Sequence, residues 1–203
     1  MTKYLGSLIN LDETQAMPAD RYEDTSANGV WNLTEQLMLN NQSKWPTAGL
    51  TLQRGVFAGG NYVNVIQYID ITTLGNATDF GDLTRGFHLG AGCASSTRGI
   101  FGGGDTGYAG NENVIDYITI ASTGNATDFG DLTVARKALA ACSSSTRGIF
   151  GGGYASSYSN VLGYITIGST GNATDFGDLS VARTELASCS STTRGIWAGG
   201  TVS

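Results

Sequence analysis

Four arginines stand before a glycine at near-regular intervals, and their side chains could together bind an acid. They are Arg54, Arg98, Arg147 and Arg194. A guanidinium presents a planar fork of donors that fits a carboxylate, so converging arginines would form an acid clamp like that of a sialidase. The alternative is that each arginine bonds carbonyls or an aspartate in a neighbouring structural unit. Because the sequence around all four is alike, we expect the structural role.

Paired aspartates also recur, three residues apart. The pairs are Asp79 with Asp82, Asp128 with Asp131, and Asp175 with Asp178. Two such carboxylates could act as general acid and base, or could bind calcium. They lack the dense alternation of Asp and Asn that a calcium loop carries. We expect them to cap turns by accepting backbone N–H bonds, with a structural calcium ion as the open alternative.

The other reactive side chains argue against catalysis. His88 is the only histidine, whereas a copper site like that of galactose oxidase needs more than one imidazole. No Gly-x-Ser-x-Gly elbow is present to support a Ser-His-Asp triad. Cys93, Cys142 and Cys189 each lie five residues before one of the arginines, and we expect them to be small buried residues on an inner strand. The sequence therefore predicts no enzyme activity, no cofactor and no metal site.

These residues recur because the chain is built from repeats. The motif Gly-Asn-Ala-Thr-Asp-Phe-Gly-Asp-Leu begins at Gly75, Gly124 and Gly171, and the arginines are spaced by 44, 49 and 47 residues. Periods of this size indicate propeller blades or solenoid turns. With 30 glycines and only 2 prolines, the composition favours short strands joined by tight turns.

Each repeat is predicted to hold four antiparallel strands. In the best-defined repeat they are expected at 137–144, 147–151, 161–167 and 174–181, with a tight turn at Gly171-Asn172. The segment 114–120 is apolar on both faces, as expected for a sheet packed between two neighbours. The predicted fold class is therefore all-β, with about three repeats of 44–49 residues in a domain spanning 47–203. A β-solenoid of stacked parallel coils is the alternative.

Residues 1–46 do not repeat and form a separate N-terminal segment. Asn32 and Glu35 have the spacing of a capping box, which predicts a short helix over 33–41. A helix of this length is not stable alone. We therefore expect the segment to anchor the protein or to serve its assembly.

The repeats resemble the kelch repeats of β-propellers. The resemblance consists of a Gly-Gly pair, a strand tyrosine, an aromatic residue before a leucine, and an arginine. These are Gly103, Gly104, Tyr117, Phe129, Leu132 and Arg136 in one repeat, and Gly152, Gly153, Tyr164, Phe176, Leu179 and Arg183 in the next. Phe129 and Phe176 stand where kelch repeats usually carry tryptophan. The resemblance implies kelch-like β-propeller blades.

A second resemblance covers nearly the whole chain. The run Asp-Phe-Gly-Asp-Leu-Thr-Val-Ala-Arg at 128–136, and Gly-Val-Trp-Asn-Leu-Thr-Glu-Gln at 29–36 ahead of Trp45-Pro46, look like virion proteins of tailed bacteriophages, particularly marine ones. This resemblance implies a non-enzymatic tail-fibre or adhesin component that presents its blades to the host surface. A purely architectural decoration or connector protein without a ligand is the alternative. Either would be made in the host cytoplasm and located in the virion.

The net charge of the chain and the number of its repeats limit the kinds of partner that it can bind. The net charge of -6 and pI near 4.6 argue against nucleic acid, whose binding needs a positive surface. No apolar run is long enough to span a membrane, and the start of the chain lacks a signal-peptide core. Three blades and part of a fourth are fewer than most propellers need for closure, which leaves apolar faces to cover. We expect a homo-oligomer, with a trimer as first choice and a dimer as second, bound to other tail proteins.

One loop varies while the rest of the repeat stays constant. Between the last glycine that follows the second strand and the start of the third strand lie four residues in the first repeat, nine in the second and seven in the third, whereas strand tyrosine and turn glycine are always seven apart. Loops on a rigid scaffold are where recognition concentrates. These loops are therefore candidates for contact with a host glycan or protein, although neutral drift would also vary them. The candidate recognition residues are Tyr62, Asn64, Asp105, Tyr108, Asn111, Asn113, Tyr154, Tyr158 and Asn160.

Overall fold

The computed structural model describes residues 53–107 and 110–202. The N-terminal segment 1–46 with its predicted helix, and the loop residue Tyr108, lie outside these ranges. All regular secondary structure in the described part of the chain is β-strand, and all strand pairs there are antiparallel. The all-β fold class is confirmed, and a solenoid of parallel coils is excluded for the described residues.

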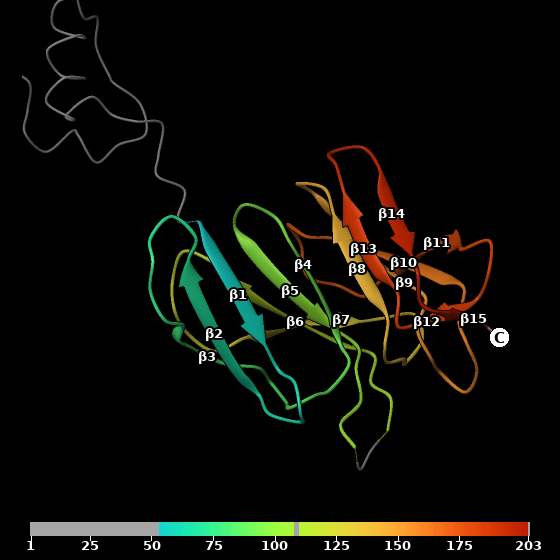
Figure 1. Ribbon diagram of the computed structural model, residues 1–203, viewed down its shortest axis with the longest axis horizontal. Helices are drawn as coiled ribbons and strands as arrows, with labels where there is room; N and C mark the ends of the chain where they lie inside the picture. Colours follow the sequence, from blue (N-terminus) through green and yellow to red (C-terminus); the bar gives the residue numbers. More distant parts are fainter. Residues whose placement is uncertain (1–52, 108–109, 203) are drawn as a thin grey trace, which may run out of the picture. The chain divides into compact units, whose positions relative to one another are not determined.

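The strands form one sheet per repeat (Figure 1). The first repeat contributes β1 (Arg54–Ala58), β2 (Val65–Asp70) and β3 (Thr78–Asp82). The second contributes β4 (Ala91–Ala94), β5 (Arg98–Gly102), β6 (Val114–Thr119) and β7 (Thr127–Asp131). The third contributes β8 (Ala140–Ser143), β9 (Arg147–Gly151), β10 (Val161–Thr166) and β11 (Thr174–Asp178). Neighbours in the chain are neighbours in each sheet, so every repeat is a simple meander.

A half-repeat follows the third sheet. The hairpin of β13 (Ala187–Ser190) and β14 (Gly195–Ala198) is equivalent to the first two strands of a repeat. A short pair, β12 (Arg183–Thr184) with β15 (Thr201–Val202), flanks it. No third or fourth strand of this half-repeat occurs within the described ranges.

The predicted strands match closely in the middle of the sheet and differ at several strand ends. β9 covers the predicted residues, and β10 ends one residue early. β8 begins at Ala140 rather than at 137, because Ala138 has a positive φ of 53° that no extended strand allows. β11 ends at Asp178, and the next N–H, of Leu179, instead donates to the carbonyl of Asn160 at 2.7 Å.

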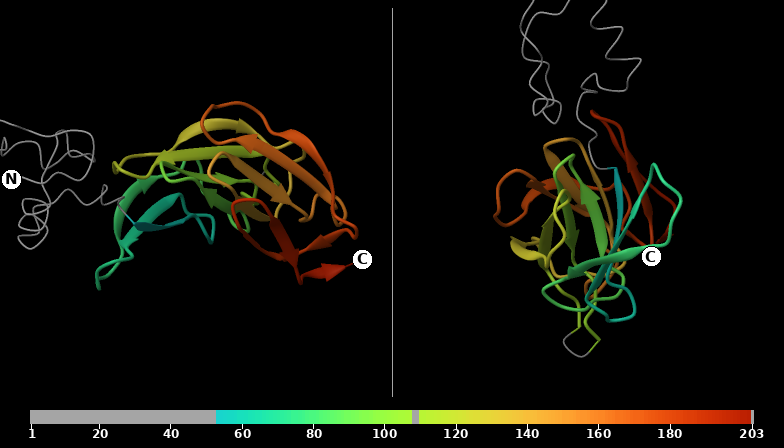
Figure 2. Two further views of the ribbon diagram at one scale, coloured as in Figure 1. Left: turned by 90° about the horizontal axis from the view of Figure 1, so that it is seen from above. Right: turned by 90° about the vertical axis from the view of Figure 1, so that its left-hand side faces the viewer.

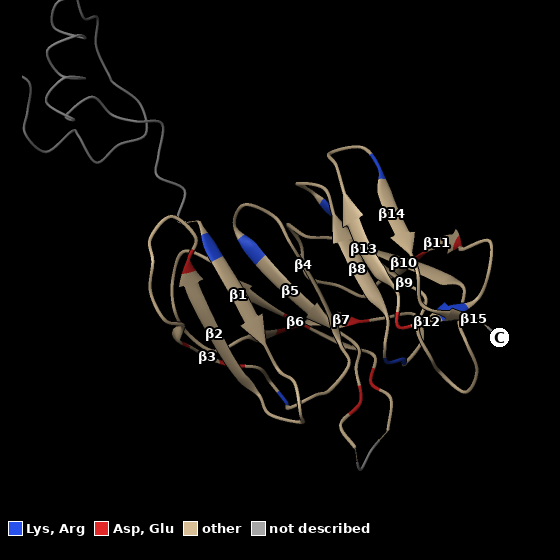
Figure 3. Ribbon diagram, viewed as in Figure 1, with Lys and Arg blue, Asp and Glu red and all other residues tan. Residues whose placement is uncertain are grey.

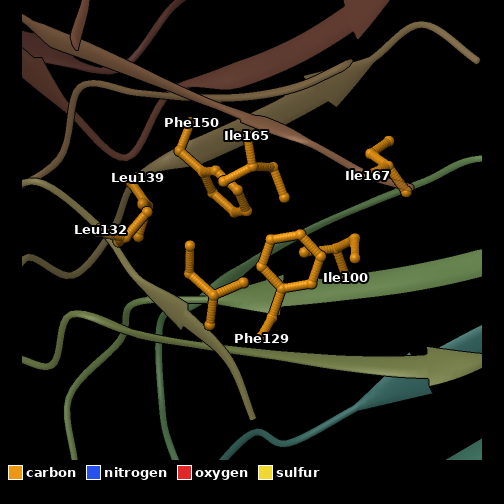
Figure 4. Close-up of a cluster of buried hydrophobic side chains, with 8 residues drawn as sticks. Ile100, Phe129, Leu132, Leu139, Phe150, Ile165 and Ile167 are labelled. Atoms are coloured by element: carbon orange, nitrogen blue, oxygen red, sulfur yellow. The ribbon is translucent and has the colours of Figure 1, made fainter. Parts of the chain in front are cut away.

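Successive sheets pack face against face (Figure 2). We call the contact between the first and second repeats the first joint, and that between the second and third the second joint. The first joint buries Ile66, Phe80, Leu83, Phe87, Phe101 and Ile118. The second buries Ile100, Ile115, Phe129, Leu132, Leu139, Phe150, Ile165 and Ile167 (Figure 4). Ile115 and Ile118 of the same strand lie in different joints, so the prediction that this strand is buried on both faces is confirmed.

The first strands of successive repeats also lie beside one another. β8 contacts both β4 and β13, and serine side chains link them to one another. Ser143 Oγ donates to the Ala94 carbonyl at 2.6 Å, and Ser190 Oγ donates to the Ser143 carbonyl at 2.7 Å. The Ser-rich sequence that precedes the later Arg-Gly pairs is therefore explained by contact between repeats.

Candidate recognition surface

The regularly spaced arginines hold the joints together. Arg54 Nη1 donates to the Ile120 carbonyl at 2.6 Å, and Arg98 Nη1 donates to the Ile167 carbonyl at 2.9 Å, each in the next repeat. The guanidinium of Arg54 lies 4.5 Å from the ring centroid of Tyr68 in its own sheet, a distance at which cation–π attraction acts. The structural role expected from the sequence is confirmed for these two arginines, which begin β1 and β5 (Figure 3).

A second set of arginines crosses the same joints. Arg85 Nη2 donates to the Val114 carbonyl at 2.9 Å, and Arg136 Nη1 donates to the Val161 carbonyl at 2.7 Å. Arg136 is fully buried, and this burial lowers the pKa of its guanidinium to about 10. These arginines tie the start of each third strand to the preceding repeat, which fixes the base of the variable loop.

The paired aspartates lie in the fourth strands, which for Asp175 and Asp178 agrees with the strand predicted at 174–181. Asp175 accepts a hydrogen bond from the N–H of Gly177 at 3.3 Å, and it is the one member of the six for which the described structure shows such a cap. The expected capping role is therefore wrong for the other five. No group of three or more His, Cys, Asp or Glu side chains among residues 53–107 and 110–202 is arranged to hold a metal ion.

The cysteines lie on inner strands as predicted, but the expected burial is complete only for Cys142, is partial for Cys93 and is wrong for Cys189. A Cβ built on Gly148 would lie 2.8 Å from Cys93 Sγ, and one on Gly195 would lie 2.8 Å from Cys142 Sγ. Each sulfur thus fills the space above a glycine of the next repeat. Burial raises the pKa of Cys93 to about 12, which makes it a poor nucleophile. All three cysteines are free, and Cys189 is exposed.

The variable loops lie beside the crossovers that link one repeat to the next. His88 forms a β-bridge with Asp105, and Lys137 forms one with Tyr154. The loop between the second and third strands therefore shares one end of the sheets with the crossover, as the antiparallel topology requires. We call this end, made of residues 59–64, 86–90, 103–107, 110–113, 137–138 and 153–160, the loop surface.

Three tyrosines form the aromatic part of the loop surface. Tyr62 is 49% exposed and its ring centroid lies 5.4 Å from that of His88. Tyr154 is 37% exposed and packs edge-on against Tyr158 at 6.0 Å. The rings thus offer both apolar faces and hydroxyl groups to a ligand.

The acidic and amide candidates hold the loops in place. Asp105 is buried, pairs with Lys137 Nζ, and accepts the Gly107 N–H at 2.6 Å. The hydrogen bond from Lys137 holds the pKa of Asp105 below its usual value. Asn111 Nδ2 bridges to the next loop, donating to the carbonyls of Tyr154 at 3.0 Å and Ala155 at 2.9 Å. The loops of the second and third repeats are therefore fixed to each other.

The three remaining asparagines close the base of each loop through their backbone. The carbonyls of Asn64, Asn113 and Asn160 accept the N–H groups of Leu83, Leu132 and Leu179 at 2.7, 2.6 and 2.7 Å. These contacts use the main chain of the asparagines. The same position in each repeat therefore has a structural role in closing the loop.

Sequence reasoning missed Lys137 and Asp116. Lys137 is the only lysine after residue 46. A charged residue that occurs once in an otherwise repetitive sequence could have identified it as a candidate. Asp116 is buried and accepts a hydrogen bond from Thr84 Oγ1 at 2.7 Å, in the preceding repeat. Its position within an apolar strand was the signal, because a buried carboxylate needs a partner.

Neither a protein-family model nor a curated protein matches this chain. No helix within the described ranges is long and apolar enough to cross a membrane. The function is therefore inferred from the geometry of the loops and joints.

Proposed function

We propose that the repeats are kelch-like propeller blades and that the protein is a non-enzymatic virion component, most directly a tail-fibre adhesin. Four antiparallel strands in the second and third repeats, with the first strands of successive sheets in contact, support the blade assignment. The Gly-Gly, tyrosine, phenylalanine and arginine positions of the kelch-like pattern all serve the joints or the sheet. The virion assignment is supported by the resemblance of the sequence to tailed-phage proteins.

The observation that carries the adhesin role is a fixed scaffold beneath variable loops. The carbonyl contacts of Arg54 and Arg98 have similar lengths at the two joints. The side-chain oxygens of Asn125 and Asn172 likewise each accept an N–H of the preceding repeat, from Asp82 and Asp131, at 3.0 Å. The loops above them differ in length, and they expose Tyr62 and Tyr154. A rigid frame with adaptable, aromatic loops is how many binding proteins present a recognition surface.

The ligand class that suits this surface is a host-surface glycan or an exposed protein loop. Tyrosine rings stack on the apolar faces of sugars, and their hydroxyls and the surrounding Ser and Asn groups can bond polar substituents. The ion pair of Lys137 with Asp105 is internal to the surface, so charge contributes less to ligand choice than shape and hydrogen bonding.

The adhesin role is tested by binding of the full chain. Fluorescently labelled protein is applied to an array of bacterial surface glycans and to host cells. We expect Tyr62→Ala combined with Tyr154→Ala to reduce binding at least tenfold, with a melting temperature within about 2 °C of wild type, because both rings are largely exposed. Leu74→Ala is the matched control, since this exposed residue lies at the opposite end of β2. Equal binding by the double variant and the wild type would refute the role.

A purely architectural virion role is the second candidate. The observation that favours it is the exposure of large apolar side chains at the two ends of the row of sheets, Phe57 at 59% and Ile196 at 56%. Such residues suit contacts with other copies or with other tail proteins. The trimer expected from the resemblance also belongs to this proposal. Under this role the tyrosine variants would change neither binding to cells nor incorporation into particles.

A further inference from the structure

We infer that the half-repeat of one copy docks on the first repeat of a second copy, head to tail, and reuses the joint that the chain forms internally. The inference depends on the repeat geometry and not on the adhesin role. The two exposed ends of the described repeats carry the two complementary halves of this joint.

The inner part of an internal joint has three recurring contacts. A cysteine of one repeat packs over a glycine of the next, as Cys142 does over Gly195. An arginine at the start of a second strand donates to an isoleucine carbonyl in the next repeat, as Arg98 does to Ile167. The apolar residue two positions after that arginine, Val56 or Ile100, shares a cluster with a phenylalanine of the next repeat.

This third contact is complete in the second joint. Ile100 and Phe150 are both 0% exposed and belong to one apolar cluster. Removing large apolar side chains from water is the dominant favourable contribution to such a contact. The cluster is therefore the main source of stability in the joint, and the arginine and cysteine contacts fix its register.

The half-repeat carries one side of the joint without its partner. Cys189 and Arg194 are exposed, and Ile196 is 56% exposed. The equivalent Cys142 and Ile100 are buried. The face that β14 turns away from the third repeat thus has the cysteine, arginine and isoleucine that elsewhere bind the following repeat.

The first repeat carries the other side. A Cβ on Gly55 would meet only Ile69 and Ile71 of its own sheet, so no sulfur of the described chain occupies the space above it. Phe57 is 59% exposed and Ile71 is 63% exposed. The equivalent Phe101 and Phe150 are 9% and 0% exposed, and Ile120 and Ile167 are 9% and 1% exposed. In the described residues no guanidinium donates to the Ile71 carbonyl.

A second copy placed after the half-repeat satisfies all of these groups at once. Cys189 would pack over Gly55, Arg194 would donate to the carbonyl of Ile71, and Ile196 would cover Phe57. The two surfaces differ from each other, so the contact is heterologous and builds a ring or a filament. Because the half-repeat provides two strands where an internal joint has four, we expect association on the order of micromolar.

The test uses two variants that each damage one side. Ile196→Asp removes the tail surface, and Phe57→Asp removes the head surface. The full chain and both variants are studied by sedimentation velocity from about 1 to 100 µM, where mass action favours the assembly. Val134→Asp is the control, because Val134 is 38% exposed in the crossover between the second and third repeats.

The expected result is specific to a heterologous contact. Wild type and Val134→Asp associate, each end variant alone is monomeric, and a 1:1 mixture of the two end variants gives a dimer and nothing larger. The mixture retains one intact head and one intact tail, which permits a single contact. A monomeric wild type, or a mixture that stays monomeric, overturns the inference. Self-association of one end variant on its own would indicate a symmetric contact and would also overturn the inference.

A disulfide provides an independent readout of register. In the internal joints the glycine Cβ position lies 2.8 Å from the cysteine sulfur, which is close to the separation of a Cβ and the distal sulfur in a disulfide. Gly55→Cys should therefore form an intermolecular disulfide with Cys189 under mild oxidation, giving a ladder of covalent multimers on a non-reducing gel. Gly55→Ser should give none. The same band pattern for both variants would contradict the proposed register.

Discussion

The side-chain oxygen of Asn125 accepts a hydrogen bond from the backbone N–H of Asp82 at 3.0 Å, and so joins the second repeat to the fourth strand of the first. Asn172 makes the same bond to Asp131 at 3.0 Å. The neighbouring backbone continues the pairing, since Gly124 N–H donates to the Phe80 carbonyl at 2.7 Å. The Gly-Asn-Ala-Thr motif therefore joins successive repeats as well as turning the chain between two strands.

Asn125→Ala is expected to destabilise the protein by about 1 kcal/mol, because a typical hydrogen bond contributes this much and the Asp82 N–H would lose its partner. For a domain of this size the melting temperature should fall by about 2–4 °C. Asn76→Ala is the matched control, because Asn76 occupies the same motif position and no strand of the described residues precedes the first repeat to receive its side chain. Thermal unfolding followed by circular dichroism measures both. An equal loss in the two variants would show that the motif acts within its own turn.

Gly130→Ala should destabilise the protein more than Gly177→Ala. Both glycines have positive φ, 144° and 132°, so both substitutions carry the same backbone strain. A Cβ on Gly130 would lie 2.6 Å from the carbonyl carbon of Gly171, whereas one on Gly177 would meet nothing within 4 Å. We expect a difference of about 2 kcal/mol in the free energy of unfolding from this overlap. Chemical denaturation of both variants should show it, and indistinguishable midpoints would mean that the joint can open without cost.

The ion pair of Asp105 with Lys137 should make the loop surface sensitive to acid. Lys137 lowers the pKa of Asp105 below its model-compound value of 3.8. A carboxylate with a lowered folded pKa adds stability that is present above its unfolded pKa and is lost as pH falls through the folded pKa. Wild type should therefore lose more stability than Lys137→Met between about pH 5 and pH 2.

This comparison is made by measuring melting temperature against pH. Burial of Asp116 raises its pKa, so its protonation in acid acts in the opposite direction, but it does so equally in both proteins. Parallel curves for wild type and Lys137→Met would exclude a contribution from the pair.

The cysteines should differ in reactivity according to their place in the row of repeats. Burial raises the pKa values of Cys93 and Cys142, and Cys189 is exposed. Iodoacetamide at pH 8 should alkylate Cys189 first, as measured by mass spectrometry of peptides from protein kept below about 1 µM to prevent association. Faster modification of Cys93 than of Cys189 would contradict the packing of Cys93 against Gly148.

The sequence predicted the features that depend on local pattern and repetition. The strand Arg147–Gly151, the burial of both faces of the third strand, and the contact of Arg54 and Arg98 with carbonyls of the next repeat are confirmed. Repetition was informative because a residue found in every repeat is constrained by the joint that every repeat makes.

Features that depend on distant partners were not predictable. Asp105 and Lys137 are 32 residues apart in the chain, and no local pattern relates them. The aspartate pairs were expected to cap turns by accepting backbone N–H bonds, and among the described residues only Asp175 accepts such a bond. In the second repeat the register between β6 and β7 shifts at a β-bulge between Ile115 and Asp116, opposite Gly130. The aspartate motif therefore stays within this strand pair. The end of that strand is then fixed by hydrogen bonds from the next repeat.

The location of the protein on a virus particle tests the proposed function most directly. Cryo-electron microscopy of purified particles that contain this chain is expected to show the repeats at the distal part of the tail, with Tyr62 and Tyr154 facing outward. Density for the repeats inside the particle or at the capsid, with these tyrosines covered by other virion proteins, would contradict the adhesin role. Absence of the chain from purified particles would contradict both virion roles.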